Sequence, residues 1–242
     1  MKKTRSKRAA SPGGSAQDGE SQGDAAQIDG ALNVFGNVSD ACRALAANHP
    51  ALKLALDLIG APVIRQRTGG LEGLFRVIVE QQVAVPSAQA IWGRINSALD
   101  VADPQAIIAA GVDGLRAQGL SRPKAGYVVG LAETLNSGAF SFDALATLSD
   151  DEASAHLQAI KGVGPWTASI YLLFCDGRID IWPPSDVALK AAFNHAREAV
   201  RSSGPLTQGE LDARAADFAP YRGLAAHILW TYYAHIKGRR PI

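Results

Sequence analysis

The segment Leu157–Asp186, LQAIKGVGPWTASIYLLFCDGRIDIWPPSD, combines a glycine-rich turn, a position where a proline can begin a helix, and an acidic side chain at its end. Gly162 and Gly164 allow the backbone to turn tightly and to approach another molecule closely. Pro165 suits the first turn of a helix, where its missing N–H costs no hydrogen bond. Helix N-terminal amides after a glycine turn bind anions, so this segment predicts a contact with a phosphate, such as that of a nucleic acid.

Helical patterns continue almost without interruption from about Ser39 onward. Ser149 with Glu152 forms a capping box that begins a helix running to about residue 160, and Thr207 with Glu210 forms a second one. Other helix starts are expected at Pro50, Pro86, Asp103-Pro104, Ser121 and Arg222. The alternation of β-branched residues that is typical of strands is nearly absent. We therefore expect an all-α fold of about ten short helices.

Composition places limits on the partners of this chain. Its 242 residues are 47% hydrophobic, which is enough for a substantial core, and the net charge is only +1. Five basic residues lie within the first eight positions, which leaves 19 basic against 23 acidic side chains in the remainder. A DNA-binding face would therefore have to be a local arrangement of Lys and Arg on the fold.

Residues 1–30 contain almost no large apolar side chains and are expected to form a disordered tail, followed by one domain over residues 39–242. The basic tip of the tail could contact phosphates nonspecifically, although a solvated tail is the simpler interpretation.

Several classes of protein are disfavoured by the sequence. Cys42 and Cys175 are too few for a disulfide scaffold, a four-cysteine zinc site or an iron–sulfur cluster. The five histidines lack the spacing of metal ligands. No apolar run approaches the roughly 20 residues of a membrane helix, and no hydrophobic stretch follows the basic N-terminus. We expect a cytoplasmic protein without membrane contact.

The chain resembles the helix-hairpin-helix DNA glycosylase superfamily, and within it the bacterial 3-methyladenine DNA glycosylase II branch. The resemblance rests on the hairpin region, residues 150–175, and on the twenty residues that separate Trp166 from Asp186. It extends over residues 49–238 through the blocks HPALKLALDLIG, LEGLFRVIVEQQVAV, LRAQGLSRPKAGYVVGLAETL and FAPYRGLAAHILW. It implies two helical lobes with a DNA-binding cleft between them. The middle helices would form one lobe, and the first helices with those after Asp186 would form the other. The α/β domain of full-size relatives is expected to be absent.

The resemblance implies an enzyme of base excision repair. Such an enzyme flips an alkylated purine of the 3-methyladenine or 7-methylguanine type out of double-stranded DNA and leaves an abasic site. Asp186 would be the catalytic carboxylate, which stabilises an oxocarbenium-like transition state and orients or deprotonates the attacking water. A structural alternative is that Ser185 or Asp186 caps the following helix, and both roles can hold together because a cap fixes the side chain.

Trp166 stands where relatives that also cleave the DNA backbone have a lysine that forms a Schiff base, so no AP-lyase activity is expected. Lys161 lies before the glycine turn, where the family does not place that lysine. Trp166, Trp182 and Tyr221 are the expected aromatic walls of the base pocket, and a cationic purine is attracted to such rings. The alternative for each is a core position, and Ile170 replaces a pocket tyrosine of a relative.

DNA contacts are expected from the hairpin and from the loop that carries the family's DNA wedge. The hairpin residues are Lys161, Gly162, Val163, Gly164 and Thr167, and the loop residues are Gln81 and Gln82. Gln82 aligns with the wedge itself, which fills the gap left by a flipped base. Arg122 and Lys124 are either further contacts or solvated side chains. Backbone carbonyls of Gln158, Ile160 and Val163 would bind a monovalent cation. No catalytic cofactor and no iron–sulfur cluster are expected, and the protein is expected to be a nucleoid-associated monomer.

Two alternatives remain open from the sequence. A non-catalytic helix-hairpin-helix module would bind DNA without sequence preference, but it would need neither Asp186 nor its aromatic surroundings. A glycosylase for oxidised or mismatched bases is disfavoured by Trp166 and by the small number of cysteines.

Overall fold

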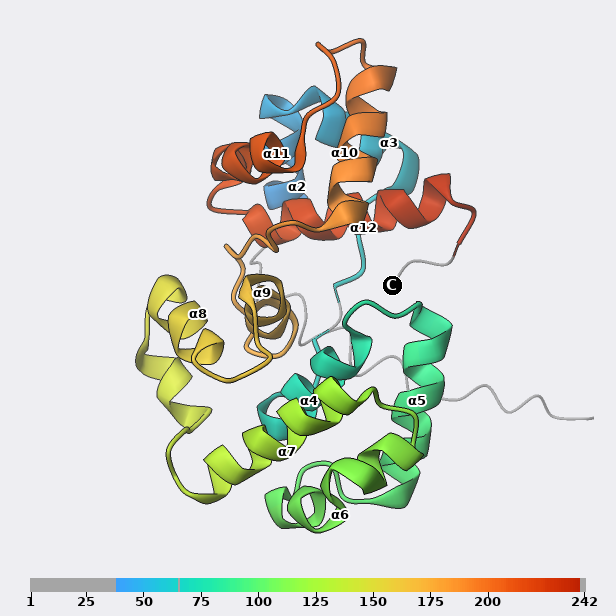
Figure 1. Cartoon of the computed structure of the whole chain (residues 1–242). Coiled ribbons are helices and arrows are strands. Elements are labelled where there is room, and N and C mark those ends of the chain that lie inside the picture. Colours follow the sequence, from blue (N-terminus) through green and yellow to red (C-terminus); the bar gives the residue numbers. More distant parts are fainter. Residues whose placement is uncertain (1–37, 65, 240–242) are drawn as a thin grey trace, which may run out of the picture.

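A computed structural model describes residues 38–64 and 66–239, and every regular element within these ranges is a helix (Figure 1). The predicted all-α class is therefore confirmed. The predicted disordered tail, residues 1–30, lies outside the described residues. None of the helices in the described ranges has the length and apolar character needed to cross a membrane.

The helices form two lobes, which we name the terminal lobe and the middle lobe. The terminal lobe contains α2 (Val38–Asn48), α3 (Pro50–Ile59), α10 (Val187–Ala199), α11 (Gln208–Arg214), the 3₁₀-helix η2 (Ala215–Phe218) and α12 (Arg222–Ile236). The middle lobe contains α4 (Gly70–Glu80), α5 (Val85–Ala98), α6 (Pro104–Ala117), α7 (Arg122–Asn136), the 3₁₀-helix η1 (Asp143–Thr147), α8 (Asp150–Gln158) and α9 (Pro165–Phe174). Helix α3 packs on α10 and α12, whereas α4 packs on α5, α7 and α9 (Figure 1). This division is the two-lobed arrangement that the resemblance implied.

Local sequence signals account for most helix starts. Both predicted capping boxes, at Ser149 and Thr207, are present with their reciprocal hydrogen bonds. Asp103 caps α6 by accepting a hydrogen bond from the backbone N–H of Gln105 at 2.9 Å. Two expectations need correction. Ser121 occupies the N-cap position of α7 but its side chain makes no capping bond, and α5 begins at Val85, one residue before the predicted proline.

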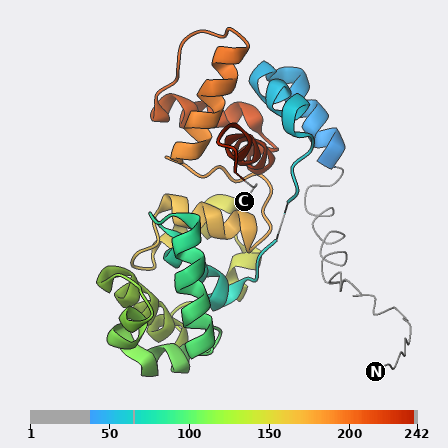
Figure 2. The ribbon, with the colours of Figure 1, turned by 90° about the vertical axis from the view of Figure 1, so that its right-hand side faces the viewer.

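The chain passes between the lobes twice. Residues 60–64 and 66–69 lie between α3 and α4, as Figure 2 shows, and residues 175–186 return from α9 to α10. The return segment lies against the start of α12, where the N–H of Gly223 donates to the carbonyl of Ile179 at 3.0 Å. A Cβ on Gly223 would lie 2.6 Å from that carbonyl oxygen, so the close approach requires glycine. Arg222 and Asp180 add an ion pair at 2.9 Å. These contacts fix the path of the chain just before Asp186.

Candidate active site

Asp186 occupies the N-cap position of α10, and four donors fix its carboxylate. Oδ1 accepts hydrogen bonds from the backbone N–H groups of Ala188 and Leu189, both at 2.9 Å. Oδ2 accepts bonds from the indole Nε1 of Trp166 at 3.0 Å and of Trp230 at 3.3 Å. The side chain is 9% exposed, so little water screens its charge. The capping role considered for Asp186 is confirmed, and the helix dipole favours a negative charge at this end of α10.

The hairpin between α8 and α9 delivers Trp166 to this carboxylate. Gly164 is the N-cap of α9 and Pro165 occupies its first turn, so Trp166 extends from the beginning of the helix. Gly162 has a φ of +93°, and a Cβ there would lie 2.3 Å from the ring of Tyr127 on α7. Only glycine satisfies both the turn and this packing. The hairpin is therefore held against α7, while its tryptophan reaches toward the terminal lobe.

Gln81 connects the end of α4 to the hairpin. Its side-chain amide donates to the carbonyl of Gly162 at 3.1 Å and to the hydroxyl of Thr167 at 2.9 Å. Both groups were expected to face DNA, but in this structure Gln81 and the Thr167 hydroxyl are hydrogen-bonded to each other. Lys124 behaves similarly, because its Nζ donates to the carbonyls of Val79 and Gln81 at the end of α4. Burial lowers the pKa of Lys124.

Gln82 differs from Gln81 in being exposed. Its φ of +52° lies in the left-handed region, which is uncommon for a residue other than glycine. Two apolar side chains that follow it, Val83 and Val85, are also exposed. The loop after α4 therefore carries exposed side chains, two of them apolar, and the wedge position of Gln82 stays a prediction. Lys161 is exposed on the hairpin. Arg122 is also exposed, and its guanidinium lies 3.9 Å from the carboxylate of Asp113.

The other two predicted pocket residues lie in the terminal lobe. Trp182 is partly exposed and donates from Nε1 to Asp212 at 3.0 Å, while its ring packs 5.7 Å from that of Phe218. Tyr221 is the N-cap residue of α12 and is also partly exposed. The structure thus directs Trp182 toward Asp212 rather than toward Asp186. The assignment of both residues to a base pocket stays a prediction.

Trp230 was not among the predicted site residues. It lies 44 positions after Asp186 and reaches it because α12 crosses the start of α10. Its ring lies 5.6 Å from that of Phe174, whose other neighbours include the guanidinium of Arg67 at 4.7 Å. The only sequence signal for Trp230 is its place in the block FAPYRGLAAHILW, which gives no distance to Asp186.

His227 is a buried neighbour of this cluster. Its ring lies 5.0 Å from that of Phe174 and 5.8 Å from that of Trp230. Burial, with a smaller contribution from the positive charge of Arg67, lowers the pKa of His227 to about 4. His227 is therefore neutral at physiological pH and adds no positive charge next to Phe174 and Trp230.

The hairpin backbone meets one requirement of the expected cation site. The turn from Ile160 to Val163 closes with a 3.0 Å hydrogen bond from the N–H of Val163 to the carbonyl of Ile160. A carbonyl oxygen has a second lone pair, so Ile160 retains the capacity to bind a cation. Gln158 ends α8 beside this turn. Among the residues that the structure describes, no group of three or more His, Cys, Asp or Glu side chains is arranged to hold a metal ion.

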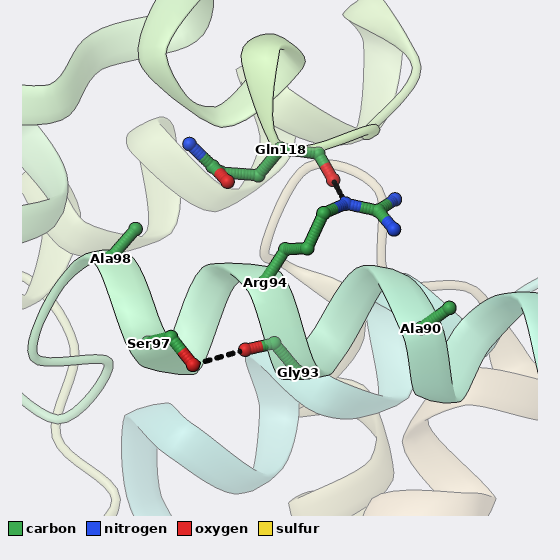
Figure 3. Close-up of a pocket in the computed structure, with 6 residues that line it drawn as sticks. All are labelled: Ala90, Gly93, Arg94, Ser97, Ala98 and Gln118. Carbon is green, nitrogen blue, oxygen red and sulfur yellow. Dashed lines mark hydrogen bonds between the residues drawn. The ribbon is translucent and has the colours of Figure 1, made fainter.

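Two surface hollows lie elsewhere in the middle lobe. One, of about 490 Å³, is formed by α5 and the end of α6, and Figure 3 shows Arg94 crossing it to donate to the carbonyl of Gln118 at 2.8 Å. The other, of about 460 Å³, lies beside the hairpin and is lined by Tyr127, Ile160 and Lys161 among others. Neither includes Asp186 or its indole donors, so both are separate from the candidate active site.

Comparisons with known proteins identify the family of this chain. Residues 75–208 match the family described as the HhH-GPD superfamily base excision DNA repair protein. The chain is 32% identical to the alkylbase DNA glycosidase-like protein mag2 of Schizosaccharomyces pombe, over 69% of this chain and 80% of the relative. It is 28% identical to DNA-3-methyladenine glycosylase 1 of the same yeast, over 66% of this chain and 70% of the relative.

Among solved structures, the fold matches the S. pombe 3-methyladenine DNA glycosylase Mag1 in complex with abasic DNA. The TM-score is 0.70 at 27% identity, and the match covers 79% of this chain and 95% of Mag1. The family match spans more than half of the sequence and includes the hairpin, Trp166 and Asp186. This chain therefore belongs to the HhH-GPD superfamily of base excision DNA repair proteins.

Proposed function

We propose that this chain is a monofunctional DNA glycosylase that removes alkylated purines such as 3-methyladenine and 7-methylguanine from double-stranded DNA. The observation that carries the proposal is the carboxylate of Asp186, held by two backbone amides and two indoles beside the hairpin. The printed names of the relatives mag2 and DNA-3-methyladenine glycosylase 1 support the substrate class.

The arrangement suits a carboxylate that acts through its charge. Cleavage of the bond between base and deoxyribose leaves positive charge on the sugar, while the bonding electron pair neutralises the cationic alkylated base. A carboxylate accepts about four hydrogen bonds, and Asp186 already accepts four within the protein. An attacking water would have to displace one of them. We therefore assign Asp186 chiefly to stabilising the oxocarbenium-like transition state rather than to removing a proton from water.

The remaining roles follow from the placement of the side chains. Trp166, Trp182 and Tyr221 would form the aromatic walls for the flipped base, whose positive charge is attracted to their rings. Gln82, exposed in the turn after α4, would fill the gap in the DNA stack. Lys161 and the backbone N–H groups of Gly162, Gly164 and Thr167 would contact the DNA backbone. Gln81 would act indirectly, because it supports the hairpin through the carbonyl of Gly162.

The carbonyls of Gln158, Ile160 and Val163 would hold a monovalent cation that attracts a phosphate of the DNA backbone. The reaction itself needs no further cofactor, since water is the nucleophile and the abasic site is the product. The enzyme would act as a monomer on chromosomal DNA in the cytoplasm.

The proposal is tested by incubating the protein with DNA treated with a methylating agent and identifying the released bases by HPLC. We expect 3-methyladenine and 7-methylguanine above the spontaneous release measured with the Asp186→Asn variant. DNA binding without release of any methylated base would instead indicate a non-catalytic helix-hairpin-helix module. Release confined to oxidised or mismatched bases from matching substrates would contradict the proposed specificity.

A further inference from the structure

Asp212, on α11, makes two contacts with the loop of residues 182–185, which leads directly into Asp186. Its Oδ1 accepts the indole N–H of Trp182 at 3.0 Å, and its Oδ2 accepts the backbone N–H of Ser185 at 3.0 Å. Gln208, one turn earlier in the same helix, donates to Oδ1 at 3.2 Å and helps to hold the carboxylate in place. Helix α11 packs against α10, the helix that Asp186 begins (Figure 1).

The second contact falls on a strained residue. Ser185 has a φ of +61°, a left-handed conformation that is unfavourable for a residue with a Cβ. Its side chain is exposed, so packing of that side chain does not account for the conformation. The hydrogen bond from its N–H to Asp212 does stabilise it. Because Ser185 directly precedes Asp186, its backbone conformation determines the direction from which the catalytic carboxylate enters the cap.

We propose that Asp212 is a positioning residue for Asp186, acting through Trp182 and the left-handed backbone of Ser185; this inference rests on the proposed function. The packing of Trp182 on Phe218 anchors the beginning of the loop independently of Asp212. Asp212 adds the constraint at the end of the loop, where Asp186 must meet the indoles of Trp166 and Trp230. Loss of Asp212 leaves the loop folded but allows Ser185 to relax, which displaces the carboxylate.

Single-turnover excision of 3-methyladenine is the first measurement. Misplacement of a reacting group by about 1 Å costs up to about 10²-fold in rate, so we expect Asp212→Ala to slow excision by roughly tenfold or more. Affinity for abasic DNA should stay within about twofold, since Asp212 is not part of the DNA-contacting set. Asp217→Ala is the matched control: its exposed carboxylate lies on η2, 3.9 Å from Arg214, and the rate should not change.

A second substitution separates positioning from general loss of structure. Glycine adopts a positive φ without strain, so Ser185→Gly in the Asp212→Ala background should recover most of the lost rate. An excision rate of Asp212→Ala equal to that of the wild type would overturn the proposal. So would a loss that Ser185→Gly leaves unchanged, because the strain at Ser185 would then not be the route by which Asp212 acts.

Indole N–H resonances in a ¹H–¹⁵N spectrum give a readout that does not depend on activity. The chain has four tryptophans, and three of them, Trp166, Trp182 and Trp230, donate to Asp186 or Asp212. We expect Asp212→Asn to shift the resonances of Trp166 and Trp230 as well as that of Trp182. A shift of the Trp182 resonance alone would overturn the positioning role of Asp212, whether or not the protein releases a base. If all three resonances shift but the wild-type protein releases no methylated base, only the proposed function is contradicted.

Discussion

The indole of Trp166 and the carboxylate of Asp186, twenty residues apart in the chain, are joined by a 3.0 Å hydrogen bond from Nε1 to Oδ2. This bond links the hairpin of the middle lobe to the N-cap residue of α10 in the terminal lobe. A lysine at position 166 would place an amine next to the carboxylate, whereas tryptophan supplies a donor that cannot attack the sugar. The spacing seen in the sequence thus corresponds to one contact across the two lobes.

Replacement of Asp186 by asparagine tests the charge directly. Asparagine retains the size of the side chain, and its oxygen can still cap α10. Its Nδ2 cannot accept from the indoles of Trp166 and Trp230, so the melting temperature should fall while the protein stays folded. The loss of negative charge facing the sugar should slow base release by about 10²-fold or more. Single-turnover excision is the measurement, and Asp103→Asn is the matched control because Asp103 caps α6 in the middle lobe. A variant with more than about a tenth of wild-type turnover would show that Asp186 is not the catalytic carboxylate.

Borohydride trapping tests the monofunctional assignment. A Schiff base between enzyme and sugar requires an amine in the active site, and Trp166 provides none. We expect no covalent enzyme–DNA adduct after reduction, while a bifunctional glycosylase run in parallel gives one. Trp166→Lys should not gain efficient lyase activity, because the space around position 166 fits an indole ring that is hydrogen-bonded to Asp186. An adduct at stoichiometric yield with the wild-type protein would disprove the assignment.

Much of the fold was predictable because its signals are local. A capping box such as that of Ser149 and Glu152 involves residues three positions apart, so the sequence alone determines it. The same holds for the proline starts and for the glycine turn at Gly162. The resemblance added the assignment of helices to lobes, which depends on long-range packing that periodicity does not specify.

The parts of the site that were not predicted depend on contacts between distant segments. Trp230 meets Asp186 only because α12 crosses α10, and Asp212 reaches Ser185 from a separate short helix. Gln81 was expected on DNA because it lies, with Gln82, at the loop that carries the DNA wedge in the family. Its amide instead bonds the hairpin, 81 positions later in the chain. The residue type of Gln81 and its position in the sequence do not indicate whether its amide bonds to DNA or to the hairpin.

His227 makes the stability of the protein depend on pH. Burial lowers its pKa to about 4 in the folded protein, against an ordinary value of 6.5. The unfolded chain therefore binds the proton more readily, and stability is lost as the pH falls from above 6.5 toward 4. For these two pKa values, the free energy of unfolding should decrease by about 2 kcal/mol between pH 7.5 and pH 5. Urea denaturation at the two pH values measures this difference.

His227→Gln should remove this part of the pH dependence, whatever its effect on the absolute stability. His235→Gln, on the exposed side of the same helix, is the control and should retain it. Glu152 and Glu210 do not interfere, because hydrogen bonds from their capping partners lower their pKa values and their contributions are lost only below about pH 4.5. An unchanged difference between pH 7.5 and pH 5 in His227→Gln would mean that other groups cause the pH dependence.

Tyr221→Ala should impair excision of charged bases more than that of neutral bases. Tyr221 is partly exposed at the start of α12, the helix that also carries Trp230. A cationic base gains about 0.5–2 kcal/mol from the face of an aromatic ring, which a neutral base does not. The measurement is single-turnover excision of 7-methylguanine or 3-methyladenine compared with hypoxanthine. Tyr233→Ala is the control, since Tyr233 lies about 18 Å further along the same helix. Equal proportional losses on charged and neutral bases would show that Tyr221 supports the fold or stacks without preference, and would remove the basis for its role in selectivity.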